Sequence, residues 1–259
     1  MEFPTPVTIR YGPADAQEGD LYLPERSDGP VVCLLHGGFW RMPHGRDQMA
    51  AVAVDLVRRG YAVWNLGYRR IGVPGGGWRG TLDDVADGVA HLAALPAEGW
   101  PLDPQRVVLV GHSAGGQLAL WAAGQLAARA RRDGVSPVGV TGVVAQGAVS
   151  DLVRAHELGL GNGAAAELLG GTPEHEPERY RAASPKMMLP LGVPQLVLHG
   201  TEDAAVPIEL ARDYAAAARS AGDTVELVEL DGMGHMEYLD PASPAHATLS
   251  AWLAASRRG

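Results

Sequence analysis

Apolar runs alternate with segments of helical periodicity along most of this chain. Short runs rich in β-branched residues, such as Val107-Val108-Leu109-Val110, are typical of buried strands, and the longer Ala- and Leu-rich segments between them are typical of helices. The pattern predicts strands at residues 7–11, 19–23, 31–35, 61–66, 107–110, 138–148, 195–199 and 225–230, and helices at 48–59, 81–95, 117–132, 208–221 and 242–257. We therefore expect an α/β fold: a mostly parallel, twisted sheet of about eight strands that opens with an antiparallel pair and carries helices on both faces.

Two of the helix boundaries carry recognisable end signals. Gly60 follows the helix expected over 48–59 and is a common stop residue. Thr81 is expected to cap the helix over 81–95. Asp83 and Asp84 are expected in its first turn, where their negative charge interacts favourably with the positive end of the helix dipole.

Two segments interrupt the alternation. Residues 72–80 contain Gly75-Gly76-Gly77 and are expected to form a flexible loop. Residues 151–189 are long, mixed and rich in glycine and proline. Long insertions are often lids or binding loops, so we expect one domain over residues 1–259 with a small lid insertion at 151–189. Surface decoration is the alternative.

The segment Gly111-His112-Ser113-Ala114-Gly115-Gly116 lies between a predicted strand and a predicted helix. A serine flanked by glycines at such a turn is the pattern of a nucleophile elbow. We expect Ser113 to be strained, to expose its hydroxyl at the top of the sheet, and to lie at the positive end of the following helix.

A serine hydroxyl needs a base and an acid that orients the base. Asp203 and His235 each follow a predicted strand downstream of Ser113, in the chain order of such enzymes. The carboxyl ends of parallel strands meet at one edge of a sheet, so we expect these side chains to approach Ser113. Glu202 is the alternative acid, and His199 is expected to be a packed, hydrogen-bonded histidine.

Negative charge on a tetrahedral intermediate requires N–H groups that already point toward it. The N–H of Ala114 is one candidate. The others lie in His36-Gly37-Gly38-Phe39-Trp40, directly after a predicted buried strand. We expect Gly38 and Phe39 to be the donors there, with Gly37 shaping the turn.

Together these residues resemble the α/β-hydrolase superfamily. The His-Gly-Gly-x-Trp form is similar to the kynurenine formamidase (arylformamidase) branch and its carboxylesterase relatives, whereas hormone-sensitive-lipase-like esterases usually carry His-Gly-Gly-Gly. Leu66-Gly67-Tyr68-Arg69 and Ser150-Asp151-Leu152 resemble segments of both groups. The resemblance implies Ser113, Asp203 and His235 as the catalytic triad and Gly38, Phe39 and Ala114 as oxyanion donors. Phe39 replaces the third glycine, which disfavours a lipase-like activity on bulky substrates.

Composition narrows the partners. The net charge of −9 disfavours nucleic acids and anionic membranes. No apolar run approaches the ~20 residues that span a bilayer, and residues 1–6 lack the pattern of a secretory signal, so we expect a cytoplasmic protein. The single cysteine, Cys33, is expected to be a buried thiol. We find no metal-binding or dinucleotide motif and expect no metal and no cofactor. A monomer and a homodimer both remain open.

The sequence thus predicts a serine hydrolase that cleaves a small ester or amide through an acyl-enzyme. An arylformamidase-like enzyme or a short-chain carboxylesterase fits this description, and an N-formyl aryl amine is the most specific substrate hypothesis. Candidate substrate contacts are Gly37, Trp40, Tyr68, Trp78 and His112; packing is the alternative for the aromatic residues, and His112 is expected to point away from Ser113. The alternative functions are a biosynthetic tailoring enzyme (lyase, dehydratase, cyclase or thioesterase) and a non-catalytic ligand receptor.

Overall fold

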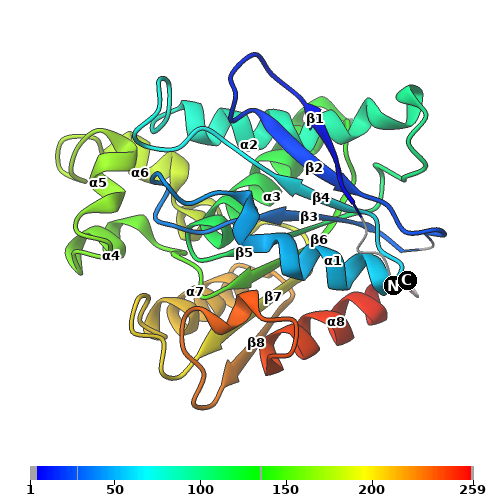
Figure 1. The fold of residues 1–259 in the computed structure, drawn as a ribbon. Coiled ribbons are helices and arrows are strands. Elements are labelled where there is room, and N and C mark those ends of the chain that lie inside the picture. Colours follow the sequence, from blue (N-terminus) through cyan, green and yellow to red (C-terminus); the bar gives the residue numbers. More distant parts are fainter. Residues whose placement is uncertain (1–4, 28, 135, 258–259) are drawn as a thin grey trace.

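The computed structural model describes residues 5–27, 29–134 and 136–257, and its core is one eight-stranded sheet (Figure 1). The strand order is β1-β2-β4-β3-β5-β6-β7-β8. The strands are β1 (Val7–Arg10), β2 (Glu18–Tyr22), β3 (Val31–Leu35), β4 (Val63–Leu66), β5 (Val107–His112), β6 (Val140–Gln146), β7 (Gln195–Gly200) and β8 (Val225–Leu230).

The pairing of the strands confirms the predicted sheet. β1 pairs with β2, and β2 with β4, in antiparallel fashion. All other pairs in the sheet are parallel. β6 begins and ends two residues inside the strand expected over 138–148; at its C-terminal end, Gly147 takes a φ of 53° and turns the chain out of the sheet.

Helices cover both faces of the sheet, as predicted. They are α1 (Ala50–Arg58), α2 (Gly80–Ala90), α3 (Ala114–Asp133), α4 (Leu152–Glu157), α5 (Ala164–Leu169), α6 (Pro177–Ala183), α7 (Glu209–Ser220) and α8 (Pro244–Ser256), with short 3-10 turns η1 (Arg46–Met49), η2 (His91–Ala93), η3 (Leu95–Glu98), η4 (Pro185–Met188) and η5 (Glu237–Leu239). Side chains of α1 and α8 pack into one apolar cluster, and those of α2, α3 and α7 pack into the other, on the opposite face.

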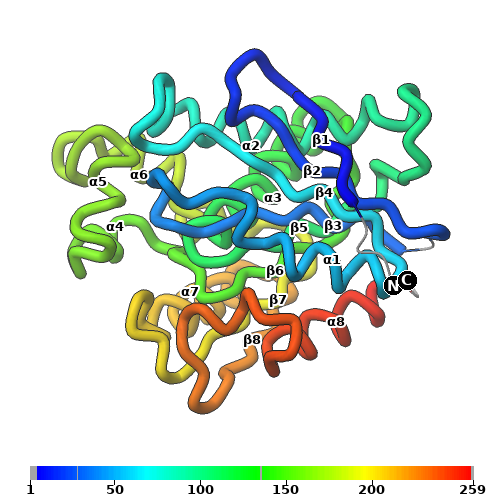
Figure 2. Tube along the Cα trace, viewed as in Figure 1, coloured from blue at the N-terminus to red at the C-terminus, as the bar shows by residue number. Residues whose placement is uncertain are grey.

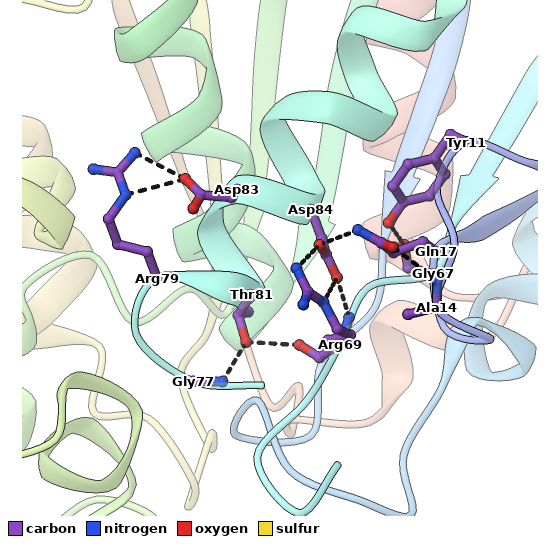
Figure 3. Close-up of polar contacts among 10 residues, drawn as sticks. All are labelled: Tyr11, Ala14, Gln17, Gly67, Arg69, Gly77, Arg79, Thr81, Asp83 and Asp84. Atoms are coloured by element: carbon purple, nitrogen blue, oxygen red, sulfur yellow. Dashed lines mark hydrogen bonds and ion pairs between the residues drawn. The ribbon is translucent and has the colours of Figure 1, made fainter. Parts of the chain in front are cut away.

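The start of α2 differs from the prediction. The residue before the helix is Arg79, and Thr81 does not cap it. Instead the Thr81 hydroxyl donates a hydrogen bond to the carbonyl of Arg69 at 2.6 Å and accepts one from the N–H of Gly77 at 3.0 Å (Figure 3). The helix also ends earlier than expected and continues as η2 and η3. Thr81 therefore ties the loop before α2 to the helix.

The sequence predicts Asp84 in the first turn of this helix, whereas the structure places Asp83 there and buries the Asp84 side chain fully. It accepts hydrogen bonds from the Arg69 guanidinium at 2.6 and 2.8 Å, from the Arg69 N–H at 2.8 Å and from Gln17 at 2.7 Å (Figure 3). A buried charge is tolerated when it is paired and hydrogen-bonded in this way. The network fixes the segment that follows β4.

Residues 151–189 contain α4, α5, α6 and η4. These short helices gather at one end of the sheet, as both the ribbon and the Cα trace show (Figures 1 and 2). The sequence predicts no secretory signal in residues 1–6. Residues 1–4 of that stretch lie outside the described residues. No helix in the described ranges is long and apolar enough to cross a membrane.

Candidate active site

The turn at Ser113 has the strained geometry that the sequence predicts. β5 ends at His112 and α3 begins at Ala114, so Ser113 alone makes the turn, with a φ of 57° and a ψ of −120°. The flanking glycines are required by backbone contacts: a Cβ on Gly111 would lie 2.0 Å from the carbonyl oxygen of Gly115, and one on Gly115 would lie 2.1 Å from that of Leu35. Larger residues would force the strand and helix apart.

The exposed hydroxyl that was expected at this turn is not seen. Ser113 is only 2% exposed. The loop that follows β3 lies against it, because a Cβ on Gly37 would be 3.0 Å from the Ser113 Cβ. Gly37 therefore allows this close approach, and the candidate nucleophile is sheltered from bulk water.

The candidate acid and base are hydrogen-bonded to each other. Asp203 follows β7, His235 follows β8, and Asp203 Oδ2 lies 2.7 Å from His235 Nδ1. The other oxygen of Asp203 accepts the N–H groups of Ala205 and Val206 at 2.9 Å. Burial by itself raises the pKa of Asp203, but the bonds from His235 and Val206 outweigh it and leave the pKa below its usual value. Glu202, the alternative acid, is exposed.

The turn after β6 brings Ser113 and this pair together. The Ser113 N–H donates to the Gln146 carbonyl at 2.8 Å. The next residue, Gly147, has Asp203 and His235 on its other side, because a Cβ there would lie 3.1 Å from Asp203 Oδ2 and 3.3 Å from His235 Nδ1. The three residues that the sequence selected thus surround one two-residue turn.

Two further histidines, His112 and His199, hydrogen-bond to the segments that carry His235 and Asp203. His112 is buried, and its Nε2 lies 2.9 Å from the His235 carbonyl oxygen. Burial, helped by the neighbouring His235, lowers the pKa of His112 to about 3, so the ring is neutral and Nε2–H is the donor. His112 therefore holds the His235 loop, and its contact with substrate stays a prediction. His199 is packed as expected, with Nε2 2.8 Å from the Val206 carbonyl oxygen.

The loop after β3 carries the candidate oxyanion donors in an unusual conformation. Gly38, Phe39 and Trp40 have φ values of 101°, 48° and 58°, in the left-handed region that non-glycine residues seldom adopt. Residues held in this way persist only when their surroundings fix them. The N–H of Ala114, at the first turn of α3, has no partner within its own helix. The loop and the helix start can therefore both offer donors.

Two of the candidate substrate contacts, Tyr68 and Trp40, brace this loop. Tyr68 is fully buried; its ring stacks on that of His36 at 4.2 Å, and its hydroxyl donates to the His36 carbonyl at 2.7 Å. Trp40 is also buried and donates from Nε1 to Gln117 Oε1 at 2.9 Å. These side chains have apolar surroundings and satisfied polar atoms, which is the packing alternative considered for them.

Trp78 lies farther out and is partly buried. The guanidinium carbons of Arg79 and Arg179 lie 5.7 and 5.8 Å from its ring centre, within range of a cation–π contact. Arg179 belongs to α6, so Trp78 connects the loop before α2 to the short helices of residues 151–189.

Sequence reasoning missed Gln117 as a functional neighbour. It is fully buried on α3, accepts from Trp40 and donates from Nε2 to the Ala183 carbonyl at 2.9 Å. A polar residue one turn after the candidate nucleophile, in a segment otherwise rich in Ala and Leu, was an available signal.

The chain is similar in sequence to esterases and to a formamidase. A probable isoprenylcysteine alpha-carbonyl methylesterase from Oryza sativa subsp. japonica is 28% identical over 245 residues, covering 89% of this chain and 58% of that protein. A kynurenine formamidase from Danio rerio is 32% identical over 124 residues, covering 44% of this chain and 37% of the relative. The chain thus spans less than two thirds of either relative.

The solved structure of a truncated carbohydrate esterase from gut microbiota shares the fold. It matches with a TM-score of 0.80 and 18% identity over 100% of this chain and 99% of that one. The profile of the BD-FAE family matches residues 20–217. Because that match spans most of the sequence, the chain belongs to the BD-FAE family and has the α/β-hydrolase fold.

Proposed function

We propose that this protein is a serine hydrolase that cleaves a small ester or amide through an acyl-enzyme. The observation that carries the proposal is the 2.7 Å contact between Asp203 and His235 beside the strained turn of Ser113. A base oriented by a buried acid next to a strained serine is the arrangement that activates a hydroxyl. The esterase and formamidase relatives support the same reaction class.

In the proposed reaction, Ser113 Oγ attacks the substrate carbonyl carbon and its proton passes to His235 Nε2. Asp203 accepts the hydrogen bond from His235 Nδ1–H, which fixes the ring tautomer and stabilises the imidazolium. The N–H groups of Ala114, Gly38 and Phe39 bind the oxyanion. Collapse of the tetrahedral intermediate breaks the bond to the leaving group, which takes the proton from His235 as it departs as an alcohol or amine. Water then attacks the acyl-enzyme carbonyl with His235 as the base. Collapse of the second tetrahedral intermediate breaks the bond to Ser113 Oγ, which regains its proton, and releases the acid.

The substrate proposal is a short-chain ester or an N-formyl aryl amine. Phe39 occupies the position where a third glycine would open the loop, and its ring is packed against Gly161, which supports a small acyl group. The relatives named as a formamidase and as a methylesterase support the two leaving-group classes. The proposal includes a single domain with residues 151–189 as its lid, a cytoplasmic location, and a monomer or homodimer that acts on a small molecule without binding nucleic acid.

The test is steady-state hydrolysis of p-nitrophenyl acetate and N-formylkynurenine by wild type, Ser113→Ala and Ser220→Ala. Ser220 is an exposed serine at the end of α7 and serves as the control. We expect Ser113→Ala to lose about 1000-fold or more in kcat/KM and Ser220→Ala to match wild type. Faster turnover of the formamide identifies an arylformamidase, and turnover of the ester alone identifies a carboxylesterase. No turnover of either substrate by wild type would contradict the proposal and favour tailoring chemistry or a receptor.

A further inference from the structure

Arg41 directly follows the loop that carries the candidate oxyanion donors, and its side chain reaches a segment more than a hundred residues away. Its Nε donates to Glu167 Oε2 at 2.5 Å, and its Nη1 donates to the Gly161 carbonyl at 2.5 Å. Nη2 contacts the same Glu167 carboxylate and the Asn162 carbonyl, the latter at 3.4 Å. One guanidinium therefore binds both the glycine-rich turn before α5 and the first turn of that helix.

The same two segments meet at a second point beside Arg41. The ring of Phe39 lies flat against Gly161, where a Cβ would come within 2.6 Å of the ring carbons. Gly161 has a φ of 56°, so the turn needs glycine both for its backbone and for this contact. The N–H and the side chain of Phe39 share one left-handed residue. The ring and the N–H are attached to the same residue, so contacts that hold the ring against Gly161 also restrain the backbone that carries the N–H.

The opposite side of the loop is fixed through its backbone. The Ile71 N–H donates to the Trp40 carbonyl at 2.7 Å, and the Met42 N–H donates to the Ile71 carbonyl at 3.1 Å. These bonds hold the residues on both sides of Arg41 and leave its side chain free to reach across. They hold the end of the loop, whereas the Phe39 contact holds its centre.

We propose that Arg41 is a positioning residue. It holds residues 161–167 against the oxyanion loop, residues 36–41, and thereby orients the Phe39 N–H toward the oxyanion. The inference rests on the proposed function, since an oxyanion donor matters only for acyl transfer. In this arrangement the Arg41 side chain holds the turn over 158–163 against Phe39.

The Arg41 contacts act on geometry more than on stability. The side chains of Arg41 and Glu167 are 28% and 46% exposed, and ion pairs between exposed groups add little to the stability of the fold. A guanidinium presents a planar fork of donors, whereas a lysine ammonium is a single point of charge. The Arg41 guanidinium uses separate nitrogens for the Glu167 carboxylate and the Gly161 carbonyl, and the shorter-range, flexible lysine ammonium does not reproduce this fixed geometry.

The experiment compares Arg41→Met, Arg41→Lys and Glu167→Gln with the control Arg212→Met. Arg212 forms a bidentate ion pair with Glu229, with hydrogen bonds of 2.8 and 2.7 Å between α7 and β8, outside the site. We measure kcat and KM on p-nitrophenyl acetate, the thermal midpoint, and amide hydrogen exchange over residues 158–163.

We expect Arg41→Met to lower kcat about tenfold, a fraction of the loss of a whole oxyanion donor, with KM and the thermal midpoint close to those of Arg212→Met. Exchange over 158–163 should rise in the same variant. Arg41→Lys should resemble Arg41→Met, and Glu167→Gln, which keeps an acceptor, should lose less. A kcat for Arg41→Met equal to that of Arg212→Met, or unchanged exchange at 158–163, would overturn the proposal.

Two features keep the result interpretable. If Arg41→Met does not fold, Glu167→Ala replaces it, because that residue is exposed on one side of a short helix and its loss removes the same ion pair. Ser113→Ala is assayed in parallel. If that variant retains hydrolysis, the proposed function fails, whereas the exchange measurement still reports on the Arg41 contacts by themselves.

Discussion

The turn at Ser113 and the loop at residues 36–41 both face the proposed oxyanion, but they are held in place by different means. The Ser113 turn depends on backbone contacts at Gly111 and Gly115, one of them within the turn itself. The loop depends on side chains that arrive from elsewhere in the chain, namely Tyr68, Gln117 and Arg41 with its partner Glu167. A local sequence pattern marks the glycines that the first arrangement requires, whereas it gives no sign of the side chains that hold the second.

This difference implies different responses to mutation. An added atom at the turn meets backbone, which has no room to move. A lost atom in the loop leaves the other braces in place. A single substitution in the turn should therefore cause a large loss of stability and activity. A single substitution in the loop should cause only a partial loss.

The largest effect is expected for Gly115→Ala. The new Cβ would lie 2.1 Å from the Leu35 carbonyl oxygen and 2.4 Å from that of His36. We expect a loss of about 3 kcal/mol in the free energy of unfolding, measured by urea denaturation, and loss of esterase activity. Gly124→Ala in the same helix is the control, because its nearest neighbours are the flexible ends of Met188 and Leu191. Equal effects of the two substitutions would contradict the role of backbone contact at the turn.

The next effect concerns the ion pair between the buried Asp84 and Arg69, in the segment that follows β4. Asp84→Ala leaves the Arg69 guanidinium without its carboxylate and Gln17 without its acceptor. Asp84 is fully buried and Arg69 is 24% exposed, so the lost charge-assisted hydrogen bonds should cost about 2 kcal/mol, and kcat should fall as well, because Arg69 adjoins Tyr68. Asp83→Ala, one residue earlier, removes a carboxylate that is 44% exposed and bound to Arg79, and should cost less than about 1 kcal/mol. Chemical denaturation of both variants decides the point; similar costs would show that burial of Asp84 is unimportant.

A smaller effect is expected for Tyr68→Phe. The substitution removes one buried hydrogen bond to the His36 carbonyl and keeps the ring stacked, so it should cost about 1 kcal/mol. It should also lower kcat several-fold by loosening the oxyanion loop. Tyr180→Phe removes a comparable bond within residues 151–189, from a hydroxyl 3.1 Å from the Gly171 carbonyl oxygen. If both variants keep wild-type kcat, Tyr68 is only a packing residue.

The smallest effect is a dependence on pH. The pKa of Asp203 is lower in the folded protein, so its ionised form adds stability above the unfolded value of about 3.9. That contribution disappears as the pH falls through the folded value. Asp203→Asn should therefore be less stable than wild type at neutral pH, and the gap should narrow below pH ~4. Thermal midpoints recorded across this range measure the gap; a constant gap would argue against an ionised Asp203 in the fold.

The same contrast explains what the sequence could predict. All eight strands, the antiparallel opening and the positions of Ser113, Asp203 and His235 follow from apolar alternation and from residues that come directly after strands. The roles of Trp40 and Tyr68 do not, because an aromatic residue beside a loop has the same local pattern whether it lines a pocket or braces the chain. Only their burial and satisfied polar atoms distinguish the two.

Two polar residues were misjudged for a related reason. Thr81 and Asp84 occupy positions where a helix cap and a first-turn acid are expected. Their actual partner is Arg69, which reaches them from the segment after β4 (Figure 3). Local propensity gives no information about a partner twelve or fifteen residues away that competes for the same side chain.

The most direct test of the account is covalent labelling with a fluorophosphonate, which reacts with an activated serine, followed by mass mapping of the modified peptide. The account predicts one adduct per chain, on Ser113, and far slower labelling in His235→Ala and Asp203→Ala. Folded wild-type protein that remains unlabelled, or that carries the adduct on another serine, would contradict it.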